Sequence, residues 1–413
     1  MSAILDLHDG MLRLWHGDDC LESPGYAWFD GSQFRFGIPA LRTQRRTPRE
    51  VNTRYWSQIS TQPLSPPLGK ARHTADLVHA HLQALHQQSN APGSVLLSAP
   101  GSMDRDALSL LLGIIEHLPF TVAGLVHRTA ALAAGSGLEQ GLHVELQLHQ
   151  TVLTPFSASG GELEAGSEQV LTGQGLLALQ DQLASAIAGN FVSQTRFDPL
   201  RSADAEQALY DALPELLLNL KQQGEAQLAI NGYTVRVTRD DLAGVGAAFG
   251  ATLQGFIGQD APVLLEGPLD LLPGLALPTA VHTTQAKGLG TIIGELSTTL
   301  LQRPDELALR RRVPTLRDLP AEETVPTQGG VSAASAAPTH LLVDGVARAL
   351  SANTILAGAH SIDADPEGVR LRSNGASEVL INGEPGRDGQ ALAPGDQLSL
   401  TTGYAAQLIV VEE

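Results

Sequence analysis

The sequence predicts a duplicated α/β fold followed by a small all-β domain. A β-hairpin pattern opens the chain and is followed by short apolar runs that alternate with amphipathic stretches of helical period. The same order then starts again near residue 143. From residue 340 onward, short strand-like runs are separated by Gly, Asn, Asp and Pro, as in a small β-sandwich.

The first half opens with a hairpin over residues 3–16 that turns at Asp9-Gly10, a pair suited to tight turns. A third strand is expected over 25–30 and another over 33–37. The helix expected over 71–89 places Leu77, Leu82 and Leu85 on one face. The remaining elements are expected as strands over 94–100 and 121–127 and helices over 104–117 and 129–135.

The second half repeats this order with a hairpin over 143–159 and a strand pair that turns at Asn231-Gly232. Helices are expected over 173–193, 203–223, 239–258 and 283–301, with a strand over 262–267. We therefore expect one two-lobed domain over 1–302. Residues 303–337, which contain Arg310-Arg311-Arg312, several prolines and a run of small residues, indicate an exposed linker before a β-sandwich over 338–413.

Composition narrows the classes of function. The 413 residues carry 26 Lys+Arg against 44 Asp+Glu, a formal charge of -18, which disfavours broad binding to nucleic acid. The single cysteine, Cys20, excludes an intramolecular disulfide framework or a cysteine-based metal site. Polar residues interrupt the apolar ones after Met1, and no apolar stretch is long enough for a membrane span. These features predict a cytoplasmic protein.

Two stretches resemble the ATPase domain of DnaK-type heat-shock chaperones, a branch of the actin-like superfamily with a ribonuclease-H-like fold. SVLLSAPGSMDRDALSLLLGIIEHLPFTVAGLVHRTAALAAG, residues 94–135, is similar to the family's segment of strand, Val-Pro, helix, strand and Glu-Pro-Thr-Ala-Ala-Ala. SPGYAWFDGSQFRFGIPALRTQRRTPREVNTRYW, residues 23–56, is similar to its region around Val-Gly and Asn-Thr. The resemblance spans about residues 1–300 and implies two actin-like lobes around a nucleotide cleft.

The motifs that hold nucleotide in this family are mostly missing. Its first phosphate loop is small and glycine-containing, because backbone N–H groups must approach the phosphates closely. Here that loop is Asp6-Leu7-His8-Asp9-Gly10-Met11, and the second loop aligns with Glu145-Leu146-Gln147-Leu148-His149-Gln150, which has no glycine. Gln58 stands at the catalytic lysine position, His127 aligns with a family glutamate, and only Glu266-Gly267 remains of the adenosine-side turn.

The resemblance therefore implies a degenerate nucleotide cleft with no catalytic residue, no metal and no cofactor. Because phosphoryl transfer needs metal placement, charge neutralisation and water positioning together, we expect ATP hydrolysis to be lost. Gln147 and His149 are expected to fill the cleft floor. The residues assigned to this degenerate cleft are Asp6, His8, Asp9, Gly10, Glu145, Gln147, His149 and Gly267.

The stretch EVLINGEPGRDGQALAPGDQLSL resembles the last strands of a forkhead-associated domain, a family that reads phosphothreonine. Gly358-Ala359-His360 replaces that family's Gly-Arg turn, and Ser373-Asn374-Gly375 retains part of its second loop. Arginines can form a phosphate fork, although such charges are usually solvated. The candidate partner-binding residues are Arg370, Arg372, Ser373, Asn374 and Arg387.

Three other patterns have plainer interpretations. His79, His81 and His86 do not share one helical face and lack a carboxylate, so helix packing is favoured over zinc binding. Ser98-Ala-Pro-Gly-Ser102 lacks the Gly-x-Ser-x-Gly order of a nucleophile elbow. The run of arginines at 310–312 is read as a solvated linker, with an acidic partner or RNA as the alternative.

Two functional hypotheses follow. In the first, the chain is a non-catalytic scaffold or adaptor that binds protein partners of unknown identity, and its chaperone-like ATPase lobes have lost hydrolysis. In the second, it is a divergent active ATPase that uses magnesium and ATP. Asp6, Asp9, Glu145 and His149 would then hold the metal and the attacking water.

Overall fold

The structure is a computed structural model. The residues it describes are 2–17, 19–90, 92–258, 261–284, 288–303, 306–316, 338–343, 346–350, 354–355, 360–365, 368–373, 379–381, 384–392, 396–400 and 405–409. The chain is a mixed α/β protein that divides into two compact units, Met1–Ala321 and Glu322–Glu413.

The first sheet of unit 1 has the strand order β3-β2-β1-β7-β8. Strand β1 pairs antiparallel with β2 on one side and parallel with β7 on the other, and β7 continues parallel to β8. The strands are β1 (Ala3–Asp6), β2 (Leu12–His16), β3 (Asp19–Ser23), β7 (Ser94–Ala99) and β8 (Thr121–His127). A hairpin is thus extended by two parallel strands that arrive through helical crossovers.

The second sheet repeats this connection order. Strand β9 pairs antiparallel with β10 and parallel with β15, and β15 continues parallel to β16. Strands β11 and β12 both pair with β10, and β17 closes the far edge next to β11. The strands are β9 (Gln140–Leu146), β10 (Gln150–Ser159), β11 (Glu162–Ala165), β12 (Gln169–Thr172), β15 (Val263–Glu266), β16 (Val281–Thr284) and β17 (Arg312–Pro314).

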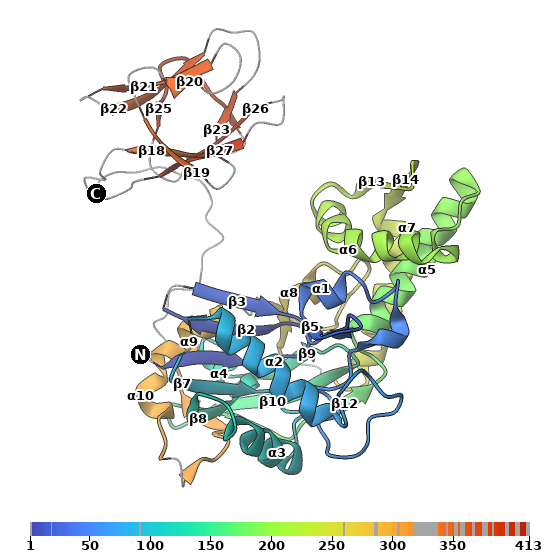
Figure 1. Ribbon diagram of the computed structural model, residues 1–413, viewed down its shortest axis with the longest axis vertical. Helices are drawn as coiled ribbons and strands as arrows, with labels where there is room; N and C mark the ends of the chain where they lie inside the picture. The colour runs from blue at the N-terminus through green and yellow to red at the C-terminus, as the bar shows by residue number, and fades with distance from the viewer. Residues whose placement is uncertain are drawn as a thin grey trace. The chain divides into compact units, whose positions relative to one another are not determined.

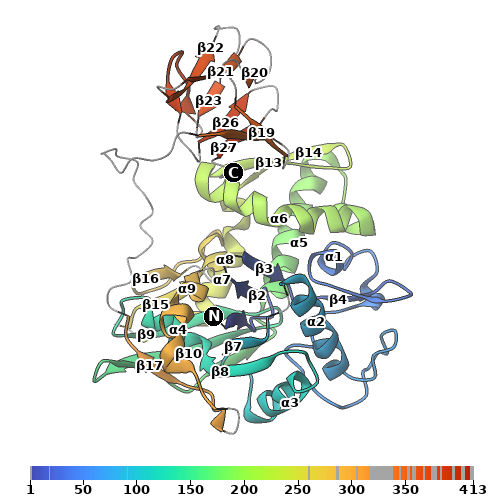
Figure 2. The same ribbon diagram turned by 60° about the vertical axis from the view of Figure 1, so that its left-hand side comes forward.

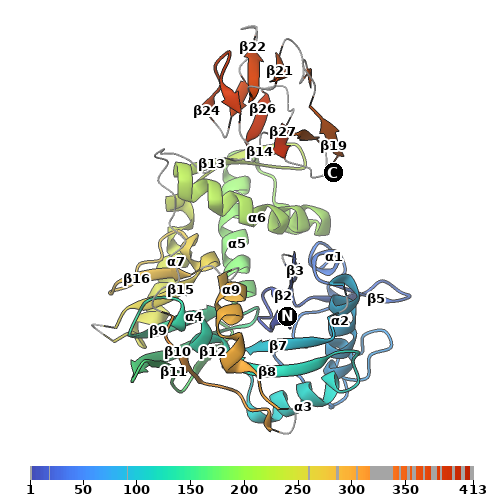
Figure 3. The same cartoon turned by 90° about the vertical axis from the view of Figure 1, so that its left-hand side faces the viewer.

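Helices cover both sheets and fill the space between them (Figure 3). Helices α2 and α3 pack on the outer face of the first sheet, α4 and α9 lie between the sheets, and α5 and α7 cover the second sheet. Every residue of α4 is buried, and its four alanines let two sheets approach one helix closely. The bounds are α2 (Thr74–Gln88), α3 (Arg105–Ile115), α4 (Arg128–Ala134), α5 (Leu176–Thr195), α6 (Ala203–Gln223), α7 (Arg239–Gln254), α8 (Gly267–Asp270), α9 (Leu289–Glu295) and α10 (Ser297–Leu300).

A helical subdomain extends from the second sheet, where α6 and the far half of α5 pack on a two-stranded hairpin (Figure 1). The hairpin strands are β13 (Glu225–Ile230) and β14 (Tyr233–Thr238). Asn231 and Gly232 have φ of 49° and 81°, as a tight turn of the predicted Asn-Gly type requires. Thr238 and Asp241 form a capping box that starts α7.

A smaller sheet, β5-β4-β6, packs beside α2 (Figure 2). Its elements are β4 (Ala27–Phe29), β5 (Phe34–Phe36) and β6 (Val51–Asn52), with α1 (Ile38–Leu41) following β5. The expected third strand at 25–30 therefore does not extend the opening hairpin. Residues 19–23 do so, and the predicted strand pairs in this separate sheet.

The described strands of unit 2 form two antiparallel sheets, ordered β19-β18-β27-β26-β23-β24 and β20-β21-β22-β25. One apolar cluster draws on both, from Leu341 and Leu408 in the first to Ile362 and Leu371 in the second. The bounds are β18 (His340–Val343), β19 (Val346–Ala349), β20 (Thr354–Ile355), β21 (His360–Asp365), β22 (Gly368–Ser373), β23 (Val379–Ile381), β24 (Glu384–Pro385), β25 (Ala391–Leu392), β26 (Gln397–Leu400) and β27 (Ala405–Ile409).

Two sequence predictions need correction. The helix expected over 283–301 is interrupted, because Val281–Thr284 joins the sheet as β16 and the described residues beyond it form the short helices α9 and α10. The linker was expected to begin at residue 303, but residues 312–314 form β17, and the Arg310 carbonyl accepts from His127 N at 2.9 Å. The strand buries Val313 completely, and this apolar burial holds the segment on unit 1.

Replacing Val313 with alanine should lower the free energy of unfolding by about 2 kcal/mol, because two fully buried methyl groups are lost. Urea unfolding followed by circular dichroism measures this. Arg312→Ala in the same strand is the control, and should cost far less stability than Val313→Ala because its ion pairs are exposed. Equal small effects of both changes would mean that residues 312–314 are detached from the sheet.

Candidate functional site

Four charged residues meet where strands of the two sheets end. Asp6 is the last residue of β1, Arg128 follows β8 directly, and Glu266 is the last residue of β15. Glu145 lies one residue before the end of β9, which pairs with β15. Because parallel strands present their carboxyl ends at one edge, the side chains converge on a common point between the sheets.

The Arg128 guanidinium is the centre of this cluster. Its Nε donates to Asp6 Oδ1 at 2.9 Å and Oδ2 at 3.1 Å, and its Nη2 donates to Glu266 Oε2 at 2.8 Å. Nη1 donates to Glu266 Oε1 and lies 3.6 Å from Glu145 Oε2. One side chain, completely buried, therefore connects the first sheet to the second through charge-assisted hydrogen bonds.

The single positive charge of Arg128 faces three carboxyl groups, those of Asp6, Glu145 and Glu266. Burial raises the pKa of Glu145 to about 8, even though Arg128 opposes the shift, so this carboxyl keeps its proton at neutral pH. Burial also raises the pKa of Asp6 against the pull of Arg128. For Glu266, Arg128 and His143 outweigh burial and hold the pKa well below its ordinary value. Glu266 is therefore the principal anionic partner of the guanidinium.

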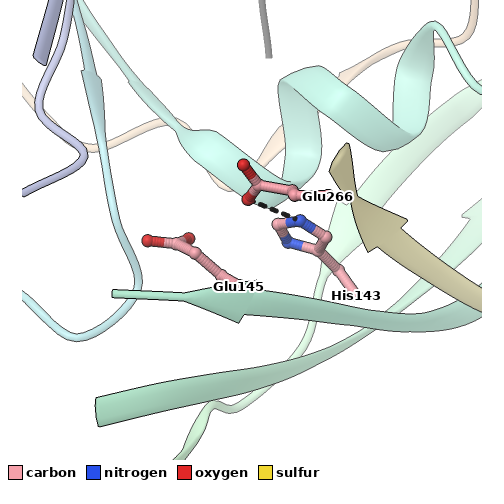
Figure 4. Close-up of side chains that lie close together, drawn as sticks. All are labelled: His143, Glu145 and Glu266. Atoms are coloured by element: carbon pink, nitrogen blue, oxygen red, sulfur yellow. Dashed lines mark ion pairs between the residues drawn. The ribbon is translucent and has the colours of Figure 1, made fainter. Parts of the chain in front are cut away.

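His143, Glu145 and Glu266 have the spacing of a metal site (Figure 4), since one ligand atom from each lies within 4.8 Å of the others. His143 Nε2 lies 3.2 Å from Glu266 Oε1, and its Nδ1 is hydrogen bonded to Thr129 Oγ1 at 2.8 Å. However, Arg128 Nη1 contacts both carboxylates of this group. The guanidinium supplies the positive charge that a cation would otherwise bring, so these residues could hold a metal only with Arg128 displaced.

Gln147 extends the cluster through polar contacts. Its Nε2 donates to Glu145 Oε1 at 2.6 Å and lies 2.8 Å from Ser102 Oγ, while its Oε1 accepts from Gln150 Nε2 at 2.8 Å. Only 2% of Gln147 is exposed. The side chain therefore fills the space beside Glu145.

The loop after β1 is also packed with side chains. His8 and Asp9 are both buried, and a Cβ at Gly10 would lie 2.8 Å from His8 Cε1. Burial and the nearby Arg128 lower the pKa of His8 to about 3, so the ring is neutral. Asp9 Oδ1 accepts from Leu148 N at 2.9 Å, and burial raises the pKa of Asp9 to about 6. Asp9 thus binds the backbone of the second loop.

The last two predicted cleft residues lie outside this cluster's contacts. His149 is half-buried, and its Nε2 is hydrogen bonded to Thr53 Oγ1 at 2.9 Å. It lines a cavity of about 420 Å³ that shares no lining residue with the cluster. Gly267 begins α8, and a Cβ there would meet no atom within 4 Å.

A second set of contacts joins the two halves of unit 1 at the segment after α1. Arg45 Nη2 lies 2.6 Å from Asp181 Oδ1, and the guanidinium carbon lies 3.7 Å from the centre of the Tyr210 ring. The completely buried Gln207 accepts from Arg45 N at 2.8 Å and donates to the Leu41 carbonyl at 3.2 Å. Residues 41–45 are thereby attached to α5 and α6.

The alternative chemistries gain no support. His81 is enclosed by hydrogen bonds: Tyr55 Oη lies 2.7 Å from its Nδ1, which also accepts from Trp56 Nε1 at 3.1 Å, and Ser23 Oγ lies 2.8 Å from its Nε2. Ser98 Oγ donates to Asp6. Arg311 and Arg312 pair with Glu168 and with Glu164, so these two arginines neutralise unit 1's own carboxylates.

The predicted partner-binding residues of unit 2 have local contacts. Arg370 Nη1 donates to the Gly389 carbonyl at 3.5 Å, and Arg372 Nη2 lies 3.4 Å from Asp363 Oδ2. The Arg387 backbone N–H donates to Gln390 Oε1 at 2.9 Å. Ser373 ends β22, and Asn374 lies outside the described residues, as do Gly358, Ala359 and Gly375.

Sequence reasoning gave Arg128 no role and named Glu266 only in the remnant of an adenosine-side turn, although both are central to the cluster. Arg128 was the only charge between the strand at 121–127 and the alanine-rich helix, and an arginine in such an apolar setting signals a buried partner. Glu266 ends an apolar strand in the same way. His143 was seen only as a strand residue.

No protein-family model matches the chain, and the comparison with curated proteins finds no match either. Within the described residues, no helix is both long and apolar enough to cross a membrane. A function for the chain must therefore be inferred from its own residues and their geometry.

Replacing Arg128 with methionine should lower the free energy of unfolding by about 3–5 kcal/mol at neutral pH, because buried carboxylates lose their counter-charge. Without Arg128 the folded-state pKa values of these carboxyls rise, so the variant should lose more stability as pH rises from 5 to 8. Denaturant titrations at both pH values measure this.

Arg13→Met is the control for that substitution. Arg13 pairs with the partly exposed Glu22, so its loss should cost about 1 kcal/mol or less. A stable, pH-independent Arg128→Met protein would contradict the role of the guanidinium.

Replacing Glu145 with glutamine should flatten the pH dependence of stability. The wild-type carboxyl has a folded pKa of about 8, above its unfolded value, so the folded state loses stability as pH rises through this range. Glutamine cannot ionise, and the variant should exceed wild type in stability above pH 8. Unfolding curves from pH 5 to 9 test this, with the exposed Glu215→Gln as control; parallel curves for wild type and Glu145→Gln would refute it.

Proposed function

We propose that unit 1 is a degenerate actin-like, DnaK-type ATPase fold that no longer hydrolyses ATP, and that the chain acts as a scaffold or adaptor for protein partners. The repeated connection order of the two sheets, each a hairpin extended by two parallel strands, supports the duplicated lobes. The two antiparallel sheets and shared core of unit 2 support a forkhead-associated-like sandwich.

The Arg128 cluster is the observation on which the loss of catalysis depends. A phosphoryl-transfer site needs carboxylates that are free to hold magnesium and backbone donors that are free to hold phosphate. Asp6 and Glu266 are instead bound by a buried guanidinium, and Glu145 keeps its proton. Magnesium would have to displace a fixed positive charge, which costs several kcal/mol in a buried site.

The phosphate loops are occupied as well. The Asp9 carboxylate takes the Leu148 N–H, one of the backbone donors that the second loop could offer to a phosphate. Gln147 fills the volume that a glycine would leave open. The position of Gln147 therefore favours the expected steric exclusion of phosphate. His149 does not contribute to it, because its ring contacts Thr53 instead.

A scaffold role fits the way the halves of unit 1 are joined. Nucleotide connects the two lobes in the family that the chain resembles, whereas here Arg128 and Arg45 make such connections with the protein's own side chains. A protein held together in this way presents the same surfaces at all nucleotide concentrations. That property suits constant binding of partners rather than a nucleotide-driven cycle of binding and release.

Titration of the full chain with Mg-ATP and Mg-ADP, followed by thermal unfolding, tests the proposal. A ligand that binds the folded state raises the melting temperature with its concentration. We expect no rise up to millimolar nucleotide, with magnesium alone as the control for metal effects. A dose-dependent rise with Mg-ATP, absent with magnesium alone, would overturn the expected loss of nucleotide binding and favour the active-ATPase alternative.

A further inference from the structure

The cavity of about 420 Å³ in unit 1 lies apart from the Arg128 cluster, since none of its lining residues belongs to that group. One wall comes from residues 44–54, and the other from the β9–β10 turn and the start of α5. Its volume is in the range of small-molecule sites. The proposed scaffold role does not account for this cavity.

The polar groups that line the cavity carry an excess of positive charge. Arg54 is exposed, and its guanidinium forms no ion pair with any described residue. Arg45 also lines the cavity, and its buried Nε has no hydrogen-bond partner among the described residues. The carboxylate of Asp181, in the same lining, is already bound by Arg45 and by Tyr210 Oη at 2.5 Å. Because Arg45 Nε is buried, the cationic donor available to a ligand in this lining is the Arg54 guanidinium.

The cavity is also held in shape before any ligand arrives. Asn52 Oδ1 accepts from the backbone N–H groups of Arg54 and Tyr55 at 2.9 and 3.0 Å, which fixes the turn that carries Arg54. His149 is anchored by Thr53, and burial together with the nearby Arg54 lowers the pKa of its ring to about 4, so it is neutral. A cavity wall whose backbone is already fixed loses little entropy on binding.

Apolar side chains lie alongside the polar Gln44, Thr53 and Thr172 in this lining. Leu148, completely buried, and Leu177 form one side, and Pro48 and Val51 form the other. A ligand that fits this lining places an anionic group at the arginines and a compact apolar body between these side chains.

We propose that this cavity binds a small organic anion, in which a carboxylate or phosphate group is joined to a compact apolar body. Arg54 is the principal contact for the anionic group and forms charge-assisted hydrogen bonds to it. The site goes beyond the scaffold function and does not depend on it.

Isothermal titration of the full chain with 4-phenylbutyrate and with phenyl phosphate tests the site. We expect at least one of the two anions to bind, and the neutral analogue 4-phenylbutyramide to bind about tenfold more weakly than the carboxylate if the carboxylate binds. Hydrogen exchange should slow at 148–149 and 177–178 on binding. The comparison of carboxylate with phosphate identifies the preferred anionic group.

Arg54→Gln should weaken binding of the anion about tenfold or more, whereas Arg49→Gln, an exposed residue outside the lining, should leave it unchanged. Failure of both anions to bind at millimolar concentration would overturn the proposal, as would equal binding to wild type and Arg54→Gln. The Arg54→Gln variant separates the two proposals: a rise in melting temperature with Mg-ATP that persists in Arg54→Gln would refute the loss of nucleotide binding and leave this site untouched, whereas a rise that disappears in Arg54→Gln would be binding at this cavity.

Discussion

The salt-bridge cluster of Arg128 is the interaction on which the centre of unit 1 depends. A buried guanidinium is unfavourable unless carboxylates surround it, and buried carboxylates are unfavourable without a counter-charge. Because Asp6 comes from the first sheet and Glu145 and Glu266 from the second, the cluster is satisfied only when both sheets are in place around α4. The charge requirement thus acts together with the apolar packing of the alanines that follow Arg128.

The same cluster sets the chemistry of the site. Metal catalysis requires carboxylates whose charge is available to the ion, and here that charge is either paired or neutralised by a proton. The hydrogen bond from Leu148 N to Asp9 and the burial of Gln147 complete a packed centre. The open volume nearby lies instead beside Arg54 and His149, where the arginines are not fully paired. The Arg128 cluster therefore favours a structural role, whereas the cavity beside Arg54 and His149 favours ligand binding.

Much of the fold could be predicted because its signals are local. The helices at 74–88, 105–115, 176–195, 203–223 and 239–254 follow apolar periodicity, and the Asn231-Gly232 turn follows from backbone preference. The strand at 19–23 was missed because Asp19, Cys20 and Glu22 give no apolar alternation. The strand at 312–314 was missed because its one buried valine follows three arginines and gives no apolar alternation, and among the described strands only β11 pairs with this segment.

The sequence alone determined that residues 145–150 contain no glycine and that position 58 is not a lysine, since absent residue types need no structure to be recognised. It also determined the alternation of elements and the two-part organisation of the chain. Only the tertiary structure decided what replaces the missing groups. Arg128 is separated from Asp6 by 122 positions and from Glu266 by 138, and no local pattern encodes a charge balance over such separations. That balance exists only when the strand ends of two sheets meet and water is excluded between them.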